Sequence, residues 1–188
     1  MEHSIAALQL AFLLQEERLG RRRLADRTGL SEMTVRLELE QLRSRGLAQL
    51  DRQGCELTGE GLRLFSPVLK LVVKVLPVEL SDLRIDVVSL AAKLRGIAPI
   101  PAAWKLRDEA IREGASGLIM LSEHAGEWIF SHDQEPVRVQ YLNDAKRLDQ
   151  SFQKANPNDF MLIVSGPNRT ACTQGLWRAI RSLVTPAR

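Results

Sequence analysis

Arginines gather in one short stretch of this sequence. Residues 21–47, RRRLADRTGLSEMTVRLELEQLRSRGL, contain seven arginines with four acidic residues among them. Guanidinium groups bind phosphate oxygens through paired N–H donors, so the stretch indicates either a surface for a nucleic-acid backbone or a solvated pair of helices. From Arg18 to Arg52 there are nine arginines and five acids, whereas the whole chain has a net charge of only +3. A phosphate-binding role must therefore come from this local clustering.

Helical signals surround the arginines. Residues 4–16 are apolar on more than one face, which predicts a helix buried on two sides. A second helix over about 21–28 and a third over about 31–45, with Ser31 as its N-cap, each end at a glycine. The link between them is only TGL. Helix, tight turn, helix is the arrangement that presents its second helix to a DNA major groove.

A short hairpin and a long apolar helix are predicted next. LAQLDRQGCEL alternates loosely around DRQG, which places Arg52 and Gln53 at a hairpin tip. LTGEG then starts a fourth helix, whose apolar run over 62–76 is typical of a helix that joins domains or subunits. Pro77 marks a boundary. We therefore predict an N-terminal domain of residues 1–76 and a second domain of residues 77–188.

The third helix has two different faces. Val35, Leu39 and Leu42 follow the spacing of a buried stripe, which leaves Met33 and Leu37 on the outward face. The domain core does not need these two large apolar residues, which suit contact with thymine methyl groups or with a partner protein.

Polar residues flank the outward face. Thr34 and Arg36 lie beside it near the start of the helix, although Glu32 and Glu40 are both four residues from Arg36 and can pair with it. Four further arginines have no nearby partner in the sequence and are predicted to contact the DNA backbone: Arg21, Arg22, Arg23 and Arg52.

Residues 4–66 resemble the winged helix-turn-helix domain of bacterial and archaeal transcriptional regulators. The resemblance lies in RRRLADRTGLSEMTVRLELEQLRSRGL, the hairpin that follows, and LTGEG. It implies that the groove-facing residues are Ser31, Met33, Thr34, Arg36 and Leu37. The rest of the chain resembles, more weakly, the uncharacterised α/β domain that follows such a winged helix in some archaeal regulators, through RDEAIREGASGLIML and the next hairpin. That part of the resemblance implies no ligand.

The second half mixes strands and helices. The patterns predict a helix over about 101–113, a hairpin with Gly126 in its turn, a helix over 145–154, a strand at FMLIVSG and a terminal helix over 169–184. Residues 84–91, RIDVVSLA, fit a buried strand, although Leu83, Val87, Leu90 and Leu94 also follow helical spacing. The fold class is α+β, a winged helix-turn-helix domain followed by a small mixed α/β domain.

Enzyme motifs are absent from the sequence. It contains no P-loop, GxGxxG, HExxH or GxSxG, so we expect no catalytic residues and no cofactor. His124 and His132 lack a third ligand at a fixed spacing, and we expect no metal. One strand, turn and helix start can hold an anion on free N–H groups, and its predicted ligands are Ser165, Gly166, Asn168, Arg169 and Thr170. The alternative is that Asn168 only caps its own helix.

These observations predict a cytoplasmic regulator that binds double-stranded DNA. We expect a homodimer, because the apolar helices over 4–16 and 62–76 exceed what the domain core needs, and a second domain that senses a small-molecule or anionic effector or mediates assembly. The two cysteines have no metal or disulfide spacing, and the apolar N-terminal run is too short to span a membrane and lacks signal-peptide features. Two alternatives remain open: a protein-interaction factor that docks through Met33 and Leu37, and an enzyme with an unrecognised site in the second domain.

Overall fold

The computed structural model describes residues 3–96, 102–152 and 156–184. The chain divides into two compact units, Met1–Lys70 and Leu71–Arg188. Helices combine with purely antiparallel sheets, which confirms the α+β class.

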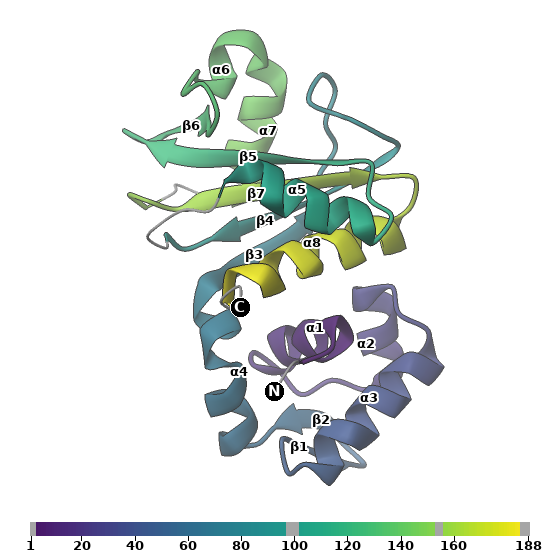
Figure 1. Ribbon diagram of the computed structural model, residues 1–188. Coiled ribbons are helices and arrows are strands. Elements are labelled where there is room, and N and C mark those ends of the chain that lie inside the picture. Colours follow the sequence, from purple (N-terminus) through teal and green to yellow (C-terminus); the bar gives the residue numbers. More distant parts are fainter. Residues whose placement is uncertain (1–2, 97–101, 153–155, 185–188) are drawn as a thin grey trace. The chain divides into compact units, whose positions relative to one another are not determined.

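Unit 1 has the element order of a winged helix (Figure 1). Its elements are α1 (Ile5–Leu14), α2 (Arg21–Thr28), α3 (Glu32–Ser44), β1 (Ala48–Asp51), β2 (Gly54–Leu57) and α4 (Gly59–Leu71), which runs to the division between the units. The antiparallel hairpin of β1 and β2, residues 48–57, is called the wing below. The helices predicted over 4–16, 21–28 and 31–45 and the predicted hairpin are confirmed.

Local side-chain chemistry sets the ends of these helices. The Ser31 hydroxyl accepts a hydrogen bond from the Thr34 N–H at 3.0 Å, which starts α3 as predicted. Gly29 ends α2 with a positive φ of 75°, a conformation that glycine adopts without strain. Val35, Leu39 and Leu42 are fully or almost fully buried, so the predicted inward stripe of α3 is confirmed.

The predicted helix over 62–76 is wrong at its C-terminal end. α4 ends at Leu71, and Val72–Pro77 form strand β3, which pairs with β4 (Val88–Leu94). Three valines in this segment favour the extended conformation, and pairing with β4 satisfies backbone groups that a helix would have satisfied internally. The units accordingly divide earlier than the boundary expected after residue 76.

Unit 2 is built on a five-stranded antiparallel sheet in the order β3-β4-β7-β5-β6. Strand β7 (Phe160–Gly166) occupies the centre, between β4 and β5 (Gly117–His124), and all seven of its residues are buried. β6 (Glu127–Phe130) pairs with β5 through a turn that holds Gly126 at φ 86°, which confirms that hairpin. The ambiguity over 84–91 resolves into a strand that begins at Val88.

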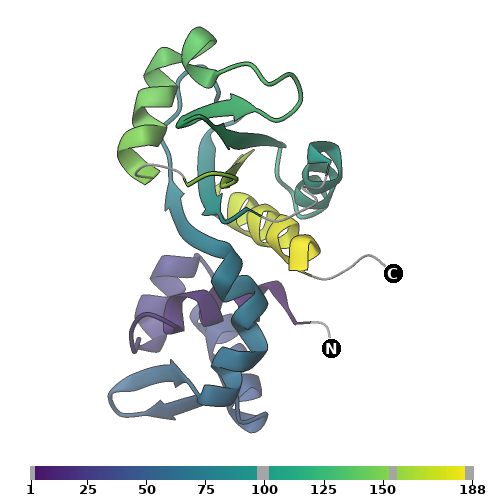
Figure 2. The ribbon, with the colours of Figure 1, turned by 90° about the vertical axis from the view of Figure 1, so that its left-hand side faces the viewer.

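Helices cover both faces of this sheet (Figure 2). α5 (Ala103–Arg112) and α8 (Arg169–Val184) pack together on one face, and α6 (Val137–Gln140) and α7 (Leu142–Phe152) cover the other. The predicted strand over 160–166 and helix over 169–184 are confirmed. The helix predicted over 145–154 begins earlier, at Leu142, and residues 153 and 154 lie outside the described residues, as does Pro101 of the helix predicted over 101–113.

A buried carboxylate ties α7 to the chain before β4. Asp144 is fully buried, and its two oxygens accept hydrogen bonds from the backbone N–H groups of Ser81, Asp82 and Leu83, each at 2.8 Å. Burial alone would raise the pKa of Asp144, but the three N–H donors outweigh it and the pKa is lowered. This carboxylate is therefore a structural anchor of unit 2.

Candidate nucleic-acid interface

The outward face of α3 carries the two apolar residues that the sequence singled out. Met33 is 62% exposed and Leu37 is 52% exposed, whereas Val35 and Leu39, on the same helix, have no exposed surface. Thr34 lies between the two faces, and its hydroxyl is 2.8 Å from that of Ser31. The start of α3 thus presents an exposed surface on which apolar and hydroxyl groups lie side by side.

The acids of α3 are already engaged. Glu40 accepts a hydrogen bond from Arg36 Nε at 2.9 Å, which lowers the pKa of Glu40 and raises that of Arg36. Glu38 accepts from the Ser4 hydroxyl at 2.8 Å, and Glu32 lies 3.8 Å from Arg22. Glu40 and Glu32 thus each have an arginine partner, which reduces their repulsion of an approaching phosphate.

Three arginines around α3 are uncommitted. Arg21 and Arg23 in the first turn of α2, and Arg52 at the wing tip, are exposed, and within the described residues they make no hydrogen bond or ion pair. Arg36 donates only its Nε to Glu40. Guanidinium donors are therefore available on both sides of the outward face of α3.

A hollow separates α3 from the wing. It has a volume of about 340 Å³, and its lining includes Arg21 from α2, Arg36 and Glu40 from α3, and Arg52 and Gln53 from the wing. The other six predicted DNA-contacting residues lie outside its lining, in the first turn of α2 and along α3: Arg22, Arg23, Ser31, Met33, Thr34 and Leu37. The structure thus brings Arg21, Arg36, Arg52 and Gln53 around one concave surface.

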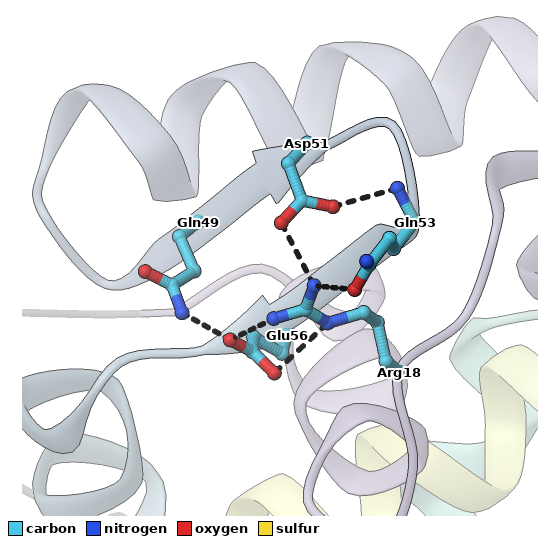
Figure 3. A network of polar contacts seen from close by, with 5 residues as sticks. All are labelled: Arg18, Gln49, Asp51, Gln53 and Glu56. Atoms are coloured by element: carbon cyan, nitrogen blue, oxygen red, sulfur yellow. Dashed lines mark hydrogen bonds and ion pairs between the residues drawn. The ribbon is translucent and has the colours of Figure 1, made fainter.

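The wing is held by a polar network that the sequence analysis missed (Figure 3). Arg18 donates from Nη1 to Asp51 at 2.8 Å and to Gln53 Oε1 at 3.0 Å, and from Nε to Glu56 at 3.0 Å, while its Nη2 pairs with the second oxygen of Glu56. Gln49 also donates to Glu56. Arg18 was counted in the excess of arginines over acids between Arg18 and Arg52, but its guanidinium donors are directed at the wing by these contacts. The strand alternation contained a signal, since Gln49, Asp51 and the cross-strand partner Glu56 share one face of the hairpin.

The predicted anion ligands in unit 2 are arranged differently from the expectation. Ser165 is fully buried and its hydroxyl is 2.9 Å from that of Ser89, while a side chain on Gly166 would meet Cys172 Sγ at 3.2 Å. Asn168 accepts from the Ala171 N–H at 2.9 Å and so caps α8. Arg169 and Thr170 form the exposed first turn of that helix.

The histidines lie apart from any larger ligand cluster. His132 is 2.9 Å from Asp133 in an exposed pair. Across the described part of the chain, no group of three or more His, Cys, Asp or Glu residues could hold a metal ion. Both cysteines are buried thiols, and burial raises the pKa of Cys55 and raises that of Cys172 to about 11.

Residues 8–72 match the family model described as the CggR N-terminal DNA binding domain. This segment is a DNA-binding domain of the winged-helix type. It is followed by a mixed α/β domain, and a similar two-domain fold occurs in a solved structure, "Hypothetical protein PH0730 from Pyrococcus horikoshii OT3". That protein is similar in fold over 97% of this chain and 93% of its own, with 22% sequence identity and a TM-score of 0.73. The family match confirms the resemblance of the first domain to winged-helix regulators, and the fold match confirms the resemblance of the second domain to an archaeal α/β domain.

Among curated proteins, none matches this chain. None of the helices in the described ranges is both long enough and apolar enough to cross a membrane.

Proposed function

We propose that this protein is a transcriptional regulator that places α3 in the major groove of double-stranded DNA. The observation that carries the proposal is the exposure of Met33 and Leu37 on a helix whose opposite face forms the core of a DNA-binding domain. Exposed apolar side chains of this kind fit the thymine methyl groups that line a major groove. Ser31 and Thr34, at the start of the helix, would contact the groove beside them.

The arginines divide into two roles in this proposal. Arg21, Arg22, Arg23 and Arg52 contact backbone phosphates, which fixes the position of the domain on the duplex without reading sequence. Arg36 reads a base edge with its Nη groups, because only its Nε is used by Glu40. Gln53, at the wing tip, adds a neutral donor next to Arg52.

The alternative is a protein-docking surface. The same exposure of Met33 and Leu37, together with the acids Glu32 and Glu40 on the outer surface of α3, also suits an apolar patch on a partner protein. Salt distinguishes the two functions. Phosphate-driven binding weakens steeply as salt rises, whereas apolar docking hardly changes.

The test is selection from random-sequence and genomic DNA fragments at two salt concentrations. Three proteins are compared: wild type, Arg36→Ala and the triple variant of Arg21, Arg22 and Arg23. We expect wild type to retain particular fragments, the triple variant to weaken all of them about equally, and Arg36→Ala to broaden the selected set. Retention of no fragment by wild type at low salt contradicts the proposal and favours the docking surface.

We also propose a homodimer that reads paired half-sites in the cytoplasm and assembles through α4 of unit 1. α4 supports the proposal, because Leu62 is 43% and Leu64 is 36% exposed on a helix that leads into the edge strand β3. Sensing of an anionic effector has weaker support, since Ser165 and Asn168 are already engaged within the fold. Sedimentation equilibrium of wild type and a Leu62→Glu/Leu64→Glu variant tests the dimer, and a monomeric wild type at micromolar concentration would exclude it.

A further inference from the structure

Arg18 is placed where it can fix the conformation of the wing. It lies between α1 and α2, directly before Leu19, whose backbone forms hydrogen bonds with Cys55 of β2 in both directions, at 3.1 and 2.9 Å. From that anchored position the guanidinium reaches across both strands of the wing (Figure 3). It binds Glu56 on β2 through two nitrogens, and Asp51 and Gln53 at the tip through a third.

The wing requires such support. A two-stranded hairpin of four residues per strand has little stability of its own in water. The backbone bridge between Leu19 and Cys55 fixes strand β2 of the wing. Arg18, next to Leu19, binds the tip residues Asp51 and Gln53 and so connects the tip to the same segment of chain. Asp51 in turn accepts from the Gln53 backbone N–H at 2.7 Å, so the conformation of the tip around Arg52 depends on a carboxylate that Arg18 holds.

The same network determines the charge next to Arg52. Asp51 lines the hollow together with Arg52, and an unpaired carboxylate there would repel a phosphate. Arg18 pairs with both Asp51 and Glu56 and lowers the pKa of Glu56 by hydrogen bonding. Four donor contacts from the planar guanidinium of Arg18 also fix the positions of the wing side chains that it binds. A lysine ammonium on a flexible stem cannot reproduce this arrangement.

We infer that Arg18 is a positioning residue for the wing, which holds the tip so that Arg52 meets a backbone phosphate of DNA bound through α3. This inference rests on the proposed function. Arg18 itself touches no phosphate, because its donors are directed at the wing.

The test is a double-mutant cycle on full-length protein, with Arg18→Ala, Arg52→Ala and the combined variant binding a selected duplex over a range of salt. Loss of one phosphate contact lowers the slope of log affinity against log salt by about 0.9. We expect Arg52→Ala and Arg18→Ala each to lower it by about that amount. The combined variant should bind no more than about twofold more weakly than Arg18→Ala alone, because the two residues act on one contact.

Two further variants separate positioning from charge. In Arg18→Ala/Asp51→Asn/Glu56→Gln the acids are neutral, and positioning predicts that wild-type affinity does not return. Arg18→Lys keeps the charge with less disturbance of folding, and it should still lose the Arg52 contact. Multiplicative losses in the cycle, or wild-type affinity in the triple or lysine variant, would overturn the inference. Wild-type protein that binds no DNA refutes the proposed function and the inference together, whereas wild-type binding with an unaffected Arg18→Ala variant refutes the inference alone.

Discussion

Leu37 and Leu39 provide a matched pair of substitutions on opposite faces of α3. Leu37 is 52% exposed and Leu39 has no exposed surface. Burial of a whole leucine side chain contributes about 1.5–3 kcal/mol, so covering the exposed half of Leu37 on DNA contributes about 1 kcal/mol, or about fivefold in Kd. Leu37→Ala should therefore weaken binding to a selected duplex about fivefold.

The salt dependence and the stability of the Leu37→Ala variant should be unchanged. No phosphate contact is removed, and alanine is at least as good a helix former as leucine at an exposed position. Leu39→Ala should behave in the opposite way, because truncation of a buried leucine costs about 2–5 kcal/mol of unfolding free energy.

Fluorescence anisotropy with selected and scrambled duplexes measures the affinity, and urea unfolding followed by circular dichroism measures the stability. A contact between Leu37 and DNA is refuted if Leu37→Ala binds the selected duplex within about 1.5-fold of wild type, or loses as much unfolding free energy as Leu39→Ala.

Three other predictions concern the stability of the two units. Asp144 is fully buried, and Asp144→Asn leaves at least one of its three N–H partners without an acceptor, so it should cost about 2–4 kcal/mol of unfolding free energy. The exposed Asp149→Asn on the same helix should cost less than about 1 kcal/mol. Tryptophan fluorescence during urea unfolding measures this in unit 2, which contains all three tryptophans of the chain. Because the pKa of Asp144 is lowered in the folded state, its stabilising contribution is complete above about pH 4 and is lost as pH falls through the folded pKa. The stability of Asp144→Asn should therefore depend less on pH in that range than the stability of wild type. Equal acid sensitivity of the two proteins would contradict this role of Asp144. Ser31→Ala removes the N-cap of α3 and should cost about 1 kcal/mol in thermal unfolding of the DNA-binding domain, and no change would show that the cap is dispensable.

The DNA-binding domain was largely predictable because its signals are local. Glycines and a capping serine set the helix ends, and apolar spacing separated Leu39 from Leu37. Each of these signals acts within a few residues of the element that it defines, so no tertiary information was needed to find α3 or its exposed face.

The errors arose where distant residues decide the structure. Val72–Pro77 carry helix-compatible apolar spacing, but pairing with β4 makes them a strand, and the paired residues are 13 (Pro77 and Leu90) to 22 (Val72 and Leu94) positions apart. Arg18 and Glu56 are 38 positions apart, so nothing near Arg18 in the sequence shows that it is paired. Ser165 directly precedes a Gly-Pro turn signal, yet its position on the central strand and its bond to Ser89 bury it.

DNA cleavage by an iron chelate attached at position 33 of α3 tests directly whether this helix lies in the major groove. A Met33→Cys variant can be labelled selectively, because both natural cysteines are buried and their thiol pKa values are raised. We expect cleavage of a selected duplex confined to a few base pairs at the site, offset between the strands as expected for a probe in the major groove. Absence of cleavage in a complex that still forms, or cleavage offset as expected for the minor groove, would contradict the placement of α3.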